Sequence, residues 1–543
     1  MTSAGLVGAP RNFLSGIRLP PATDRETNTS STPFLFLALV VIVLVGFALR
    51  QTGARAMMRF TGDEARDLLQ AKNIIEQGIF PSLGPKIYRG HGHLGPAYAY
   101  LVAIPLWLSA YDPAGAVELV LFLDVVAIVL MYFLGRELFG NLAGLIGAGL
   151  YAVSFTMVFY ARWCWHPSLV PLFTMLLFYS LIQILKGRVA FLPVVALSQG
   201  LLLQLHLSTG VLLVPVALAL WQSRRSLGRW SIAASALVFF VVLGPLLMHE
   251  LRTGFHNTRT MLRLGRVVLT GETRSIVPFW TDIAQVVADQ AFWPYGSREI
   301  LLPGWGAMYW LNVGLVIMSL QHLVVSHWDR ATRCVILAAW AILPPLSLLT
   351  FAGQRSHYYM LPWFPLPVLL VAGLLSRWTQ QKGRRWWAGL TLVLLVVTNL
   401  AMYRRYAMWL ARPQYDYFLA GPLDVKRRAV AAVLRDAGER GYDLLLVSWD
   451  WSNNKPYNYL LSNAATHPHE VRMLVVNPDT KATNHHFIDT SEFYAPNTPG
   501  HPTHTYVIVE PAHLVQLQGT ESVADLGQID VQRANGPVSA LVR

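Results

Sequence analysis

Long apolar runs recur along residues 33–404 and are separated by shorter polar segments. Each run is about 20 residues long, the length of an α-helix that crosses a bilayer. A polar tail, residues 1–32, precedes the first run, and no small-residue cleavage motif follows that run, so we expect an uncleaved signal anchor. The pattern predicts about eleven membrane spans, at 33–50, 115–135, 141–160, 167–186, 190–208, 210–222, 231–249, 306–325, 334–352, 358–376 and 387–403.

The sequence changes character after Arg405, where the composition of a soluble domain replaces the apolar runs. Residues 424–438 have helical periodicity, and three short segments are typical of strands, at 442–448, 471–476 and 504–510. The segment 93–111 is apolar but contains two prolines, so we expect a helix along the membrane interface. The fold class predicted is an all-α polytopic membrane domain with interfacial helices, followed by a small α/β domain at 405–543.

Composition agrees with a membrane protein, because 54% of the residues are hydrophobic and only 13% are charged. A soluble domain would be about a quarter charged. The net charge of +13 is not gathered in a basic tail with interleaved aromatic residues, which argues against a nucleic-acid partner. Cys164 and Cys334 are expected near opposite sides of the membrane, so the sequence predicts no disulfide framework.

Basic residues in the short loops orient the spans, because cytoplasmic loops carry an excess of Lys and Arg. With the amino end inside, the inner loops are basic, whereas the outer loops at 161–166 and 209–210 are nearly uncharged. An odd number of spans then places the carboxyl-terminal domain outside the cytoplasm. The basic residues of the inner loops are Arg136, Lys186, Arg188, Arg224, Arg225, Arg229, Arg330, Arg333, Lys382, Arg384 and Arg385.

Two longer outer loops, at 51–114 and 250–305, break this pattern. The second contains several arginines, although basic residues in an outer loop work against the predicted orientation of the spans. These arginines need another role, and we expect them to hold an anion. Polar residues of other outer loops lie on the same side. They are suited to binding a phosphate. Two other interpretations remain open: the cations contact lipid headgroups, and the aromatic residues form part of an interfacial belt. The candidates are Lys86, Arg89, His91, His93, Arg162, His166, Arg259, Arg263, Arg355, His357 and Tyr358.

The stretch FTGDEARD, residues 60–67, places Asp63 and Glu64 shortly after the first apolar run. One interpretation is a helix start, since 63–78 scans as an amphipathic helix and acidic residues in a first turn favour the helix dipole. The other is a general base that removes a proton from an incoming hydroxyl. The two interpretations are compatible, because a carboxylate near a helix start is also held rigidly.

Four short motifs occur in a definite order: Asp63–Glu64, HLGPAYAYL at 93–101, FYARWCWHPSL at 159–169 and RSHYYMLPWFP at 355–365. This order resembles that of the GT-C glycosyltransferases, specifically the bacterial relatives of protein O-mannosyltransferases and of the lipid A aminoarabinose transferase. The resemblance covers roughly residues 33–404. It implies the GT-C fold in a bacterial inner-membrane protein whose amino end is cytoplasmic.

The resemblance also implies an activity: transfer of a sugar from a polyprenyl-phosphate donor on the outer face of the membrane. The acceptor would be a hydroxyl of a protein, glycolipid or glycan, and the anomeric carbon would be inverted. Asp63 would be the base, Glu64 would position the acceptor or the base, and Arg162 and Arg355 would hold the lipid phosphate. No cofactor is expected from the nearer relatives, whereas the oligosaccharyltransferase branch of the fold depends on a divalent metal.

Two features depart from the family pattern. The aminoarabinose-type enzymes carry a Glu-Lys-Pro-Pro run where this chain has GHGHLGP at 90–96, so the expected lysine is missing. Lys86, Arg89 or one of the histidines would replace it, which leaves the phosphate ligands open. The β-trefoil insert of the eukaryotic protein mannosyltransferases is also absent from the sequence.

Three further features each have two interpretations. His91 and His93 would share a face of an extended segment and could bind a metal together with the acidic pair, although no third ligand is placed. WDWSNNKPY at 449–457 is faintly similar to the acceptor motif of oligosaccharyltransferases, but we expect an ordinary loop there. His206 either lines a cavity or is satisfied by a neighbouring helix.

Two other functions remain open from the sequence. One is a metal-dependent oligosaccharyltransferase-like enzyme or glycan polymerase of the same fold. The other is a transporter or flippase for a lipid-linked sugar, which would place polar residues near the bilayer midplane and often has repeated halves. Charged residues here gather at the outer surface and no repeat is found, which disfavours the transporter. Neither the sugar nor the acceptor can be identified.

Overall fold

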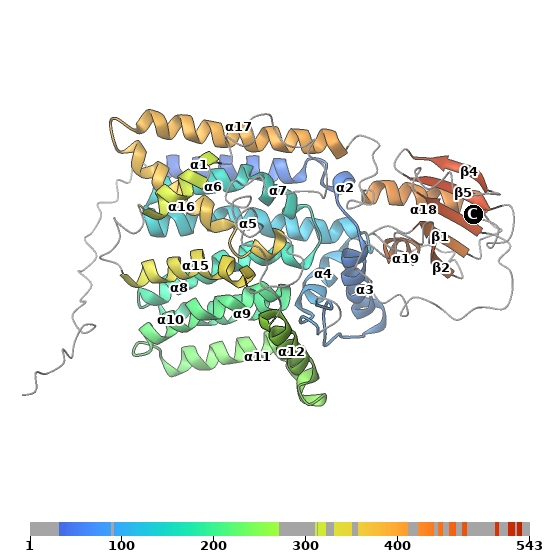
Figure 1. Ribbon diagram of the computed structural model, residues 1–543, viewed down its shortest axis with the longest axis horizontal. Helices are drawn as coiled ribbons and strands as arrows, with labels where there is room; N and C mark the ends of the chain where they lie inside the picture. Colours follow the sequence, from blue (N-terminus) through green and yellow to red (C-terminus); the bar gives the residue numbers. More distant parts are fainter. Residues whose placement is uncertain are drawn as a thin grey trace, which may run out of the picture.

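Apolar helices lie roughly parallel in one bundle, and a small sheet domain follows at the carboxyl end (Figure 1). This is a computed structural model of the chain. The predicted tail, apart from Thr32, and the long segments 271–309 and 475–504 lie outside the described residues. Those residues are 32–87, 92–270, 310–311, 313–321, 331–349, 357–410, 422–438, 444–448, 455–462, 470–474, 505–509, 520–526 and 529–534.

The bundle is built from α-helices, several of them entered through a 3₁₀ turn. The turns are η3 (His166–Leu169), η4 (Val189–Phe191), η5 (Leu207–Leu212) and η8 (His357–Met360). The α-helices are α1 (Thr32–Gln51), α5 (Pro113–Phe139), α6 (Asn141–Val153), α7 (Phe155–Ala161), α8 (Val170–Leu185), α9 (Leu192–Leu205), α10 (Leu213–Ser223), α11 (Arg229–Arg252), α15 (Ala331–Leu349), α16 (Pro365–Thr379) and α17 (Arg385–Leu410). A further helical stretch occupies 313–321.

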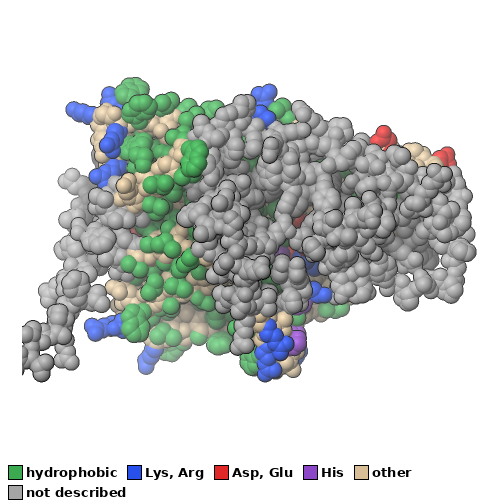
Figure 2. All heavy atoms as spheres, viewed as in Figure 1, with side chains coloured by type: hydrophobic (Ala, Val, Ile, Leu, Met, Phe, Trp, Pro, Cys, Tyr) green, Lys and Arg blue, Asp and Glu red, His purple; other side chains and the backbone are tan. Residues whose placement is uncertain are grey.

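Each predicted span overlaps helix in the described residues, and the chain is a multi-pass membrane protein. Five described helices are long and apolar enough to cross a membrane, or six if α6 and α7, bent by 60° at their junction, form one broken span. Shorter apolar helices cover most of the other predicted spans. The count of about eleven spans is therefore not established. Apolar side chains cover the middle of the bundle, and Lys and Arg gather at the end away from the sheet domain (Figure 2).

Close packing of α5 against α6 depends on two small residues. A Cβ at Gly144 would lie 2.6 Å from the backbone oxygen of Tyr132, and one at Gly135 would lie 3.0 Å from the Cα of Gly144. In a lipid bilayer the hydrophobic effect does not favour association of two apolar helices. Small residues let the two backbones approach closely, so van der Waals contacts stabilise the pair.

A buried polar cluster joins α1, α5 and α6, and we call it the α1 network. Arg50 is fully buried, and its Nε donates to Oδ2 of Asp124 at 2.6 Å. The guanidinium also donates to the backbone oxygen of Ala152 at 2.8 Å, and the Tyr151 hydroxyl donates to Oδ1 of Asp124 at 2.7 Å. Each charge therefore has partners, as burial of ions in a low-dielectric interior requires.

Four helices lie outside the parallel bundle. The short α2 (Ala54–Met57), α3 (Gly62–Gln77) and α4 (Ala97–Leu108) precede α5, and α3 and α4 lie between the bundle and the sheet domain (Figure 1). The predicted interfacial helix at 93–111 is α4. Helix α12 (His256–Thr270) follows α11 and leaves the bundle on one side, where Figure 2 shows a group of basic side chains.

The carboxyl-terminal domain contains α18 (Leu423–Ala437), α19 (Lys455–Leu461) and a five-stranded sheet within the described residues. The strand order is β2-β1-β3-β5-β4, with β2, β1 and β3 parallel and β5 antiparallel to both neighbours. The predicted helix and three predicted strands are confirmed, and the sequence did not predict the last two strands or α19. The strands are β1 (Leu444–Ser448), β2 (Glu470–Leu474), β3 (Thr505–Val509), β4 (Thr520–Asp525) and β5 (Asp530–Ala534).

The expectation of a loop at 449–457 is wrong at its end, because Lys455 begins α19; residues 449–454 lie outside the described part. Helix α19 packs against α3 and fixes the domain to the segment between α1 and α5. The Tyr459 hydroxyl donates to the backbone oxygen of Tyr111 at 2.7 Å, and Nζ of Lys72 donates to Oγ of Ser462 at 2.8 Å. The domain is thus anchored to the helix that carries the acidic pair.

Candidate active site

Helix α3 begins with a capping box. Thr61 is the N-cap, and its backbone N–H donates to Oε2 of Glu64 at 2.7 Å, while the Thr61 hydroxyl accepts from the backbone N–H of Glu64. Each side chain satisfies a backbone group that the helix leaves unpaired. The helix start predicted from the acidic pair is confirmed, with Gly62 as its first residue.

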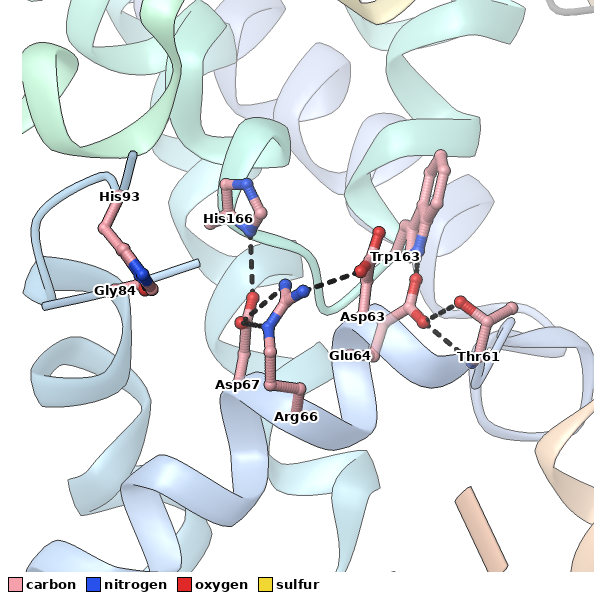
Figure 3. A network of polar contacts seen from close by, with 9 residues as sticks. All are labelled: Thr61, Asp63, Glu64, Arg66, Asp67, Gly84, His93, Trp163 and His166. Atoms are coloured by element: carbon pink, nitrogen blue, oxygen red, sulfur yellow. Dashed lines mark hydrogen bonds and ion pairs between the residues drawn. The ribbon is translucent and has the colours of Figure 1, made fainter. Parts of the chain in front are cut away.

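Glu64 is fully buried and turns away from solvent toward Thr61 and Trp163 (Figure 3). The Trp163 indole N–H donates to its Oε1. Burial raises the pKa of Glu64 above its ordinary value. The side chain fixes the start of α3, and the expectation that it positions the acceptor is not supported, because it does not line the cavity described below.

Asp63 is placed differently, although it is the adjacent residue. Its side chain is 46% exposed, and Oδ1 accepts a hydrogen bond from Nη1 of Arg66 at 2.8 Å. Within the described residues no hydrogen bond reaches its Oδ2. This oxygen can therefore accept a proton or a hydrogen bond from a molecule in the cavity.

Arg66 links Asp63 to a buried ion pair, and we call Asp63, Arg66, Asp67 and His166 the α3 network (Figure 3). Nε and Nη2 of Arg66 donate to Oδ1 of Asp67 at 3.1 and 3.0 Å, and Oδ2 of Asp67 lies 2.9 Å from Nδ1 of His166. Burial would raise the pKa of Asp67, but the Arg66 charge and the hydrogen bonds from Arg66 and His166 outweigh it and lower the pKa below its ordinary value. Asp67 is therefore an ionised, 2% exposed carboxylate.

A cavity of about 300 Å³ lies beside this network. It has a charged part, made by Asp63, Arg66 and Lys86, and a part made by aromatic rings and imidazoles. Such a mixture of apolar surface with a few convergent polar groups is typical of small-molecule sites. The lining residues are Asp63, Arg66, Pro85, Lys86, Ile87, Leu94, Trp165, His166, His206, Leu207, Ser208, Val211, Ser347, Tyr358 and Tyr359.

The structure brings together four residues of the predicted site, from three separate parts of the chain. Asp63, Lys86, His166 and Tyr358 all line the cavity. His206, for which the sequence left two interpretations, lines it as well. Of the remaining candidates, Arg89, His91 and Arg355, and the side chain of His357, lie outside the described part of the chain.

Arg162 does not reach the cavity, which corrects its expected role in holding the lipid phosphate. It is 5% exposed and lies at the end of α1, where its Nε donates to the backbone oxygen of Arg50 at 3.0 Å. Its Nη2 donates to the backbone oxygen of Thr52 and to the Tyr403 hydroxyl, each at 2.7 Å. Carbonyl groups at a helix end lack helical partners, so a buried Arg there satisfies them.

His93 also faces away from the cavity. Its Nδ1 lies 3.0 Å from the backbone oxygen of Gly84, and its backbone N–H donates to Oδ1 of Asn257 at 2.7 Å. Burial lowers the pKa of His93 below its ordinary value. The predicted His91–His93 metal pair is not tested, since His91 lies outside the described residues; among the described residues no three His, Cys, Asp or Glu side chains come together as metal ligands.

Arg259 and Arg263 lie on the exposed surface of α12 and do not line the cavity. Asn257 precedes them on α12 and is buried. Its Oδ1 accepts from the backbone N–H of His93 and its Nδ2 donates to the backbone oxygen of His93, which connects α12 to the loop that carries Lys86. The two arginines are thus positioned beside the site and not within it.

Sequence reasoning missed Arg66, Asp67 and Trp165. The first two had a signal, because residues three and four positions after Asp63 lie on the same helix face as Asp63. Once a helix start is predicted at Asp63, this spacing brings the guanidinium and a second carboxylate next to it. Trp165 had no comparable signal, since aromatic residues are frequent at every membrane interface.

Comparisons with known proteins identify the fold. No protein-family model and no curated protein sequence matches the chain. Among solved structures, ArnT from Cupriavidus metallidurans bound to undecaprenyl phosphate superimposes with a TM-score of 0.57 at 13% identity, over 94% of this chain and 99% of ArnT. The Archaeoglobus fulgidus oligosaccharyltransferase, tethered to an acceptor peptide with an NVT sequon, gives 0.52 at 14% identity, over 93% of this chain and 74% of the enzyme.

The same archaeal enzyme in complex with Zn and sulfate gives a TM-score of 0.51 at 15% identity, over 92% of this chain and 73% of the enzyme. At these identities the comparisons concern the arrangement of the chain and not its substrates. The order of motifs in the sequence and the course of the helices agree on one architecture. The chain therefore has the GT-C fold, which it shares with membrane-embedded glycosyltransferases.

Proposed function

We propose that the chain is an inverting glycosyltransferase that moves a sugar from a polyprenyl-phosphate donor to an acceptor hydroxyl on the extracytoplasmic face of a bacterial inner membrane. The observation that carries the proposal is Asp63, a half-exposed carboxylate at a cavity within a GT-C fold, whose Oδ2 receives no hydrogen bond from the described residues. Support comes from a structural neighbour bound to undecaprenyl phosphate. The acceptor would be a protein, a glycolipid or a glycan.

In this proposal Asp63 takes the proton of the acceptor hydroxyl as its oxygen attacks the anomeric carbon from the side opposite the leaving group. The bond from that carbon to the donor phosphate breaks, and polyprenyl phosphate leaves as an anion. General-base catalysis of this kind contributes about 10²- to 10⁴-fold to a rate. Arg66 holds Asp63 in place through a 2.8 Å ion pair, so the carboxylate enters the reaction already oriented.

The leaving phosphate needs cations, and Lys86 is a predicted phosphate ligand that lines the cavity. We propose that it holds the phosphate together with Arg355 and Arg89, which the sequence predicted for this role. Arg259 and Arg263 on α12 would attract the anionic donor as it arrives from the membrane surface. Several cations stabilise the charge that develops on the leaving oxygen, so the step requires no metal in principle.

The test is sugar transfer in proteoliposomes from a panel of radiolabelled polyprenyl-phosphate pentoses and hexoses. We expect Asp63→Asn to lower kcat by about 10²-fold or more with donor binding retained. The matched control is Glu76→Gln, which removes a carboxylate from the same helix at a site that pairs with Lys72 and does not line the cavity. Full activity of Asp63→Asn would show that the acidic pair is only a helix start.

A chelator separates this proposal from its nearest alternative, a metal-dependent oligosaccharyltransferase-like enzyme. The archaeal oligosaccharyltransferase has a similar fold, which is why this alternative is considered. Transfer that survives the chelator, with a polyprenyl-monophosphate donor, supports the proposal. Abolition by the chelator, with recovery on adding a divalent cation, supports the metal-dependent branch. Movement of the donor across the bilayer without transfer would indicate a flippase.

A further inference from the structure

Two histidines from different parts of the bundle lie on one wall of the cavity. His166 begins η3, and His206 lies between α9 and η5. Aromatic rings connect them: Trp165 contacts His166 with centroids 5.5 Å apart and Tyr358 with centroids 4.6 Å apart, and Tyr358 contacts His206 at 5.5 Å. All four side chains line the cavity, so they form one continuous surface.

The hydrogen-bond partner of His166 determines which of its nitrogens carries the proton. Nδ1 faces the Asp67 carboxylate at 2.9 Å, and an ionised carboxylate only accepts hydrogen bonds. Nδ1 therefore carries the hydrogen. In the neutral ring Nε2 is then a bare acceptor, so a molecule in the cavity meets an imidazole that can accept a hydrogen bond.

His206 has the opposite arrangement. Its Nδ1 accepts the backbone N–H of Ser208 at 3.2 Å and lies 2.8 Å from the Ser208 hydroxyl. A nitrogen that accepts a backbone N–H has no hydrogen of its own, so the neutral ring carries its proton on Nε2. A molecule in the cavity therefore meets a hydrogen-bond donor at His206, on the same wall as the acceptor at His166.

We propose that His166 and His206 form a subsite that recognises hydroxyl groups of the transferred sugar, one donating to Nε2 of His166 and one accepting from Nε2 of His206. The inference rests on the proposed function, because it assumes that the occupant is the sugar of the donor. A hydroxyl group both donates and accepts hydrogen bonds without carrying a charge, and the Trp165 and Tyr358 rings supply apolar surface beside it. The charged side chains, Asp63, Arg66 and Lys86, remain for the reacting atoms and the phosphate.

The subsite also restricts the class of sugar to one that carries no ammonium group. A sugar with an ammonium group would meet Arg66 and Lys86, and Asp63, the carboxylate among the cavity-lining residues, is already paired with Arg66. An unpaired polar group in such a site costs about 1–3 kcal/mol. Loss of the hydroxyl that a histidine recognises should therefore lower kcat/KM by about 10- to 100-fold.

The test compares the best neutral donor with its monodeoxy and monofluoro analogues, in both transfer and equilibrium binding to protein in nanodiscs without acceptor. At the position read by His166, fluorine cannot donate, so the fluoro donor should be as poor as the deoxy donor. At the position read by His206, the fluoro donor should keep part of its activity, since fluorine is a weak acceptor. His166→Phe and His206→Phe should each abolish discrimination at one position, whereas His249→Phe, away from the cavity, should leave both unchanged.

The outcomes separate this inference from the proposed function. If analogue discrimination persists in both variants while transfer proceeds, the subsite is wrong and the transferase stands. If binding shows the expected discrimination but no donor is transferred, the subsite stands and the transferase is wrong. An equal loss with every donor in His166→Phe would overturn the subsite in favour of His166 as a base. Should His166→Phe fail to fold, His206→Phe still decides the result, because phenylalanine keeps an aromatic ring at the contacts with Tyr358 and Tyr359.

Discussion

The α1 network and the α3 network both pair arginine with aspartate, and they have different surroundings. In the α1 network, Arg50 and Asp124 are 0% and 8% exposed at the side chain, and their neighbours are backbone oxygens and a tyrosine hydroxyl. In the α3 network, Asp63 is 46% exposed and lines a cavity. A closed network only stabilises the fold, whereas an open one retains acceptors and donors for a ligand.

The largest effect is expected in the closed network. Asp124→Asn would leave the Arg50 guanidinium buried without a counter-charge, which costs about 3–5 kcal/mol of unfolding free energy. Chemical unfolding in detergent measures the loss, and donor affinity of the folded fraction should not change. The double variant Arg50→Met/Asp124→Leu should recover most of the stability, because a well-packed apolar pair often replaces a buried ion pair without loss. Unchanged stability of Asp124→Asn would remove the distinction between the two networks.

Arg162→Gln tests the residue whose sequence prediction and structural position disagree. We expect a loss of about 2–3 kcal/mol, because a buried guanidinium that donates to several oxygens at the end of α1 is removed. Stability and donor affinity are measured on the same preparation. A fall in donor affinity at unchanged stability would restore the phosphate role and place Arg162 with the open network.

The smallest effect is expected from Asp67→Asn, at about 1–2 kcal/mol, since the amide retains one acceptor oxygen. Asp67 has a lowered pKa in the folded protein, so its contribution is complete above the unfolded-state pKa of about 3.8 and is lost as pH falls through the lower folded value. Unfolding midpoints measured from pH 7 downward should fall more steeply in the wild type than in the variant on the acid side. Parallel curves would show that Asp67 is not ionised in the network.

Much of the fold could be predicted because its signals are local. Runs of about 20 apolar residues specify spans whatever they pack against, and the acidic pair Asp63 and Glu64 before an amphipathic segment specifies a helix start. The helix at 424–438 and the strands near 444, 470 and 505 were recognisable for the same reason. Strands β4 and β5 were not, since Thr520–Asp525 and Asp530–Ala534 are short and mostly polar. They form strands because β5 pairs with β3 and β4 pairs with β5.

The candidate site shows where local signals end. Arg66 and Arg162 lie on the same predicted side of the membrane, and only Arg66 has a local signal, its position three residues after Asp63 on one helix face. Arg66 reaches the cavity from α3, one turn after Asp63, whereas the side chain of Arg162 ends among the carbonyls of α1, more than a hundred residues away along the chain. A long side chain can contact whichever group the packing of distant helices brings within its reach.

The sequence by itself determined that this protein is a multi-pass membrane protein with a small α/β domain, that a helix begins at the acidic pair, and that its motifs occur in the GT-C order. Hydrophobic run length, periodicity and the charges of a first helical turn are read from short segments and need no knowledge of the whole chain. The tertiary structure alone decided that Asp63 is open and Glu64 closed, and that Asp67 orients His166. Side chains one position apart on a helix point about 100° apart, and only the helices packed around α3 determine which of them meets the cavity.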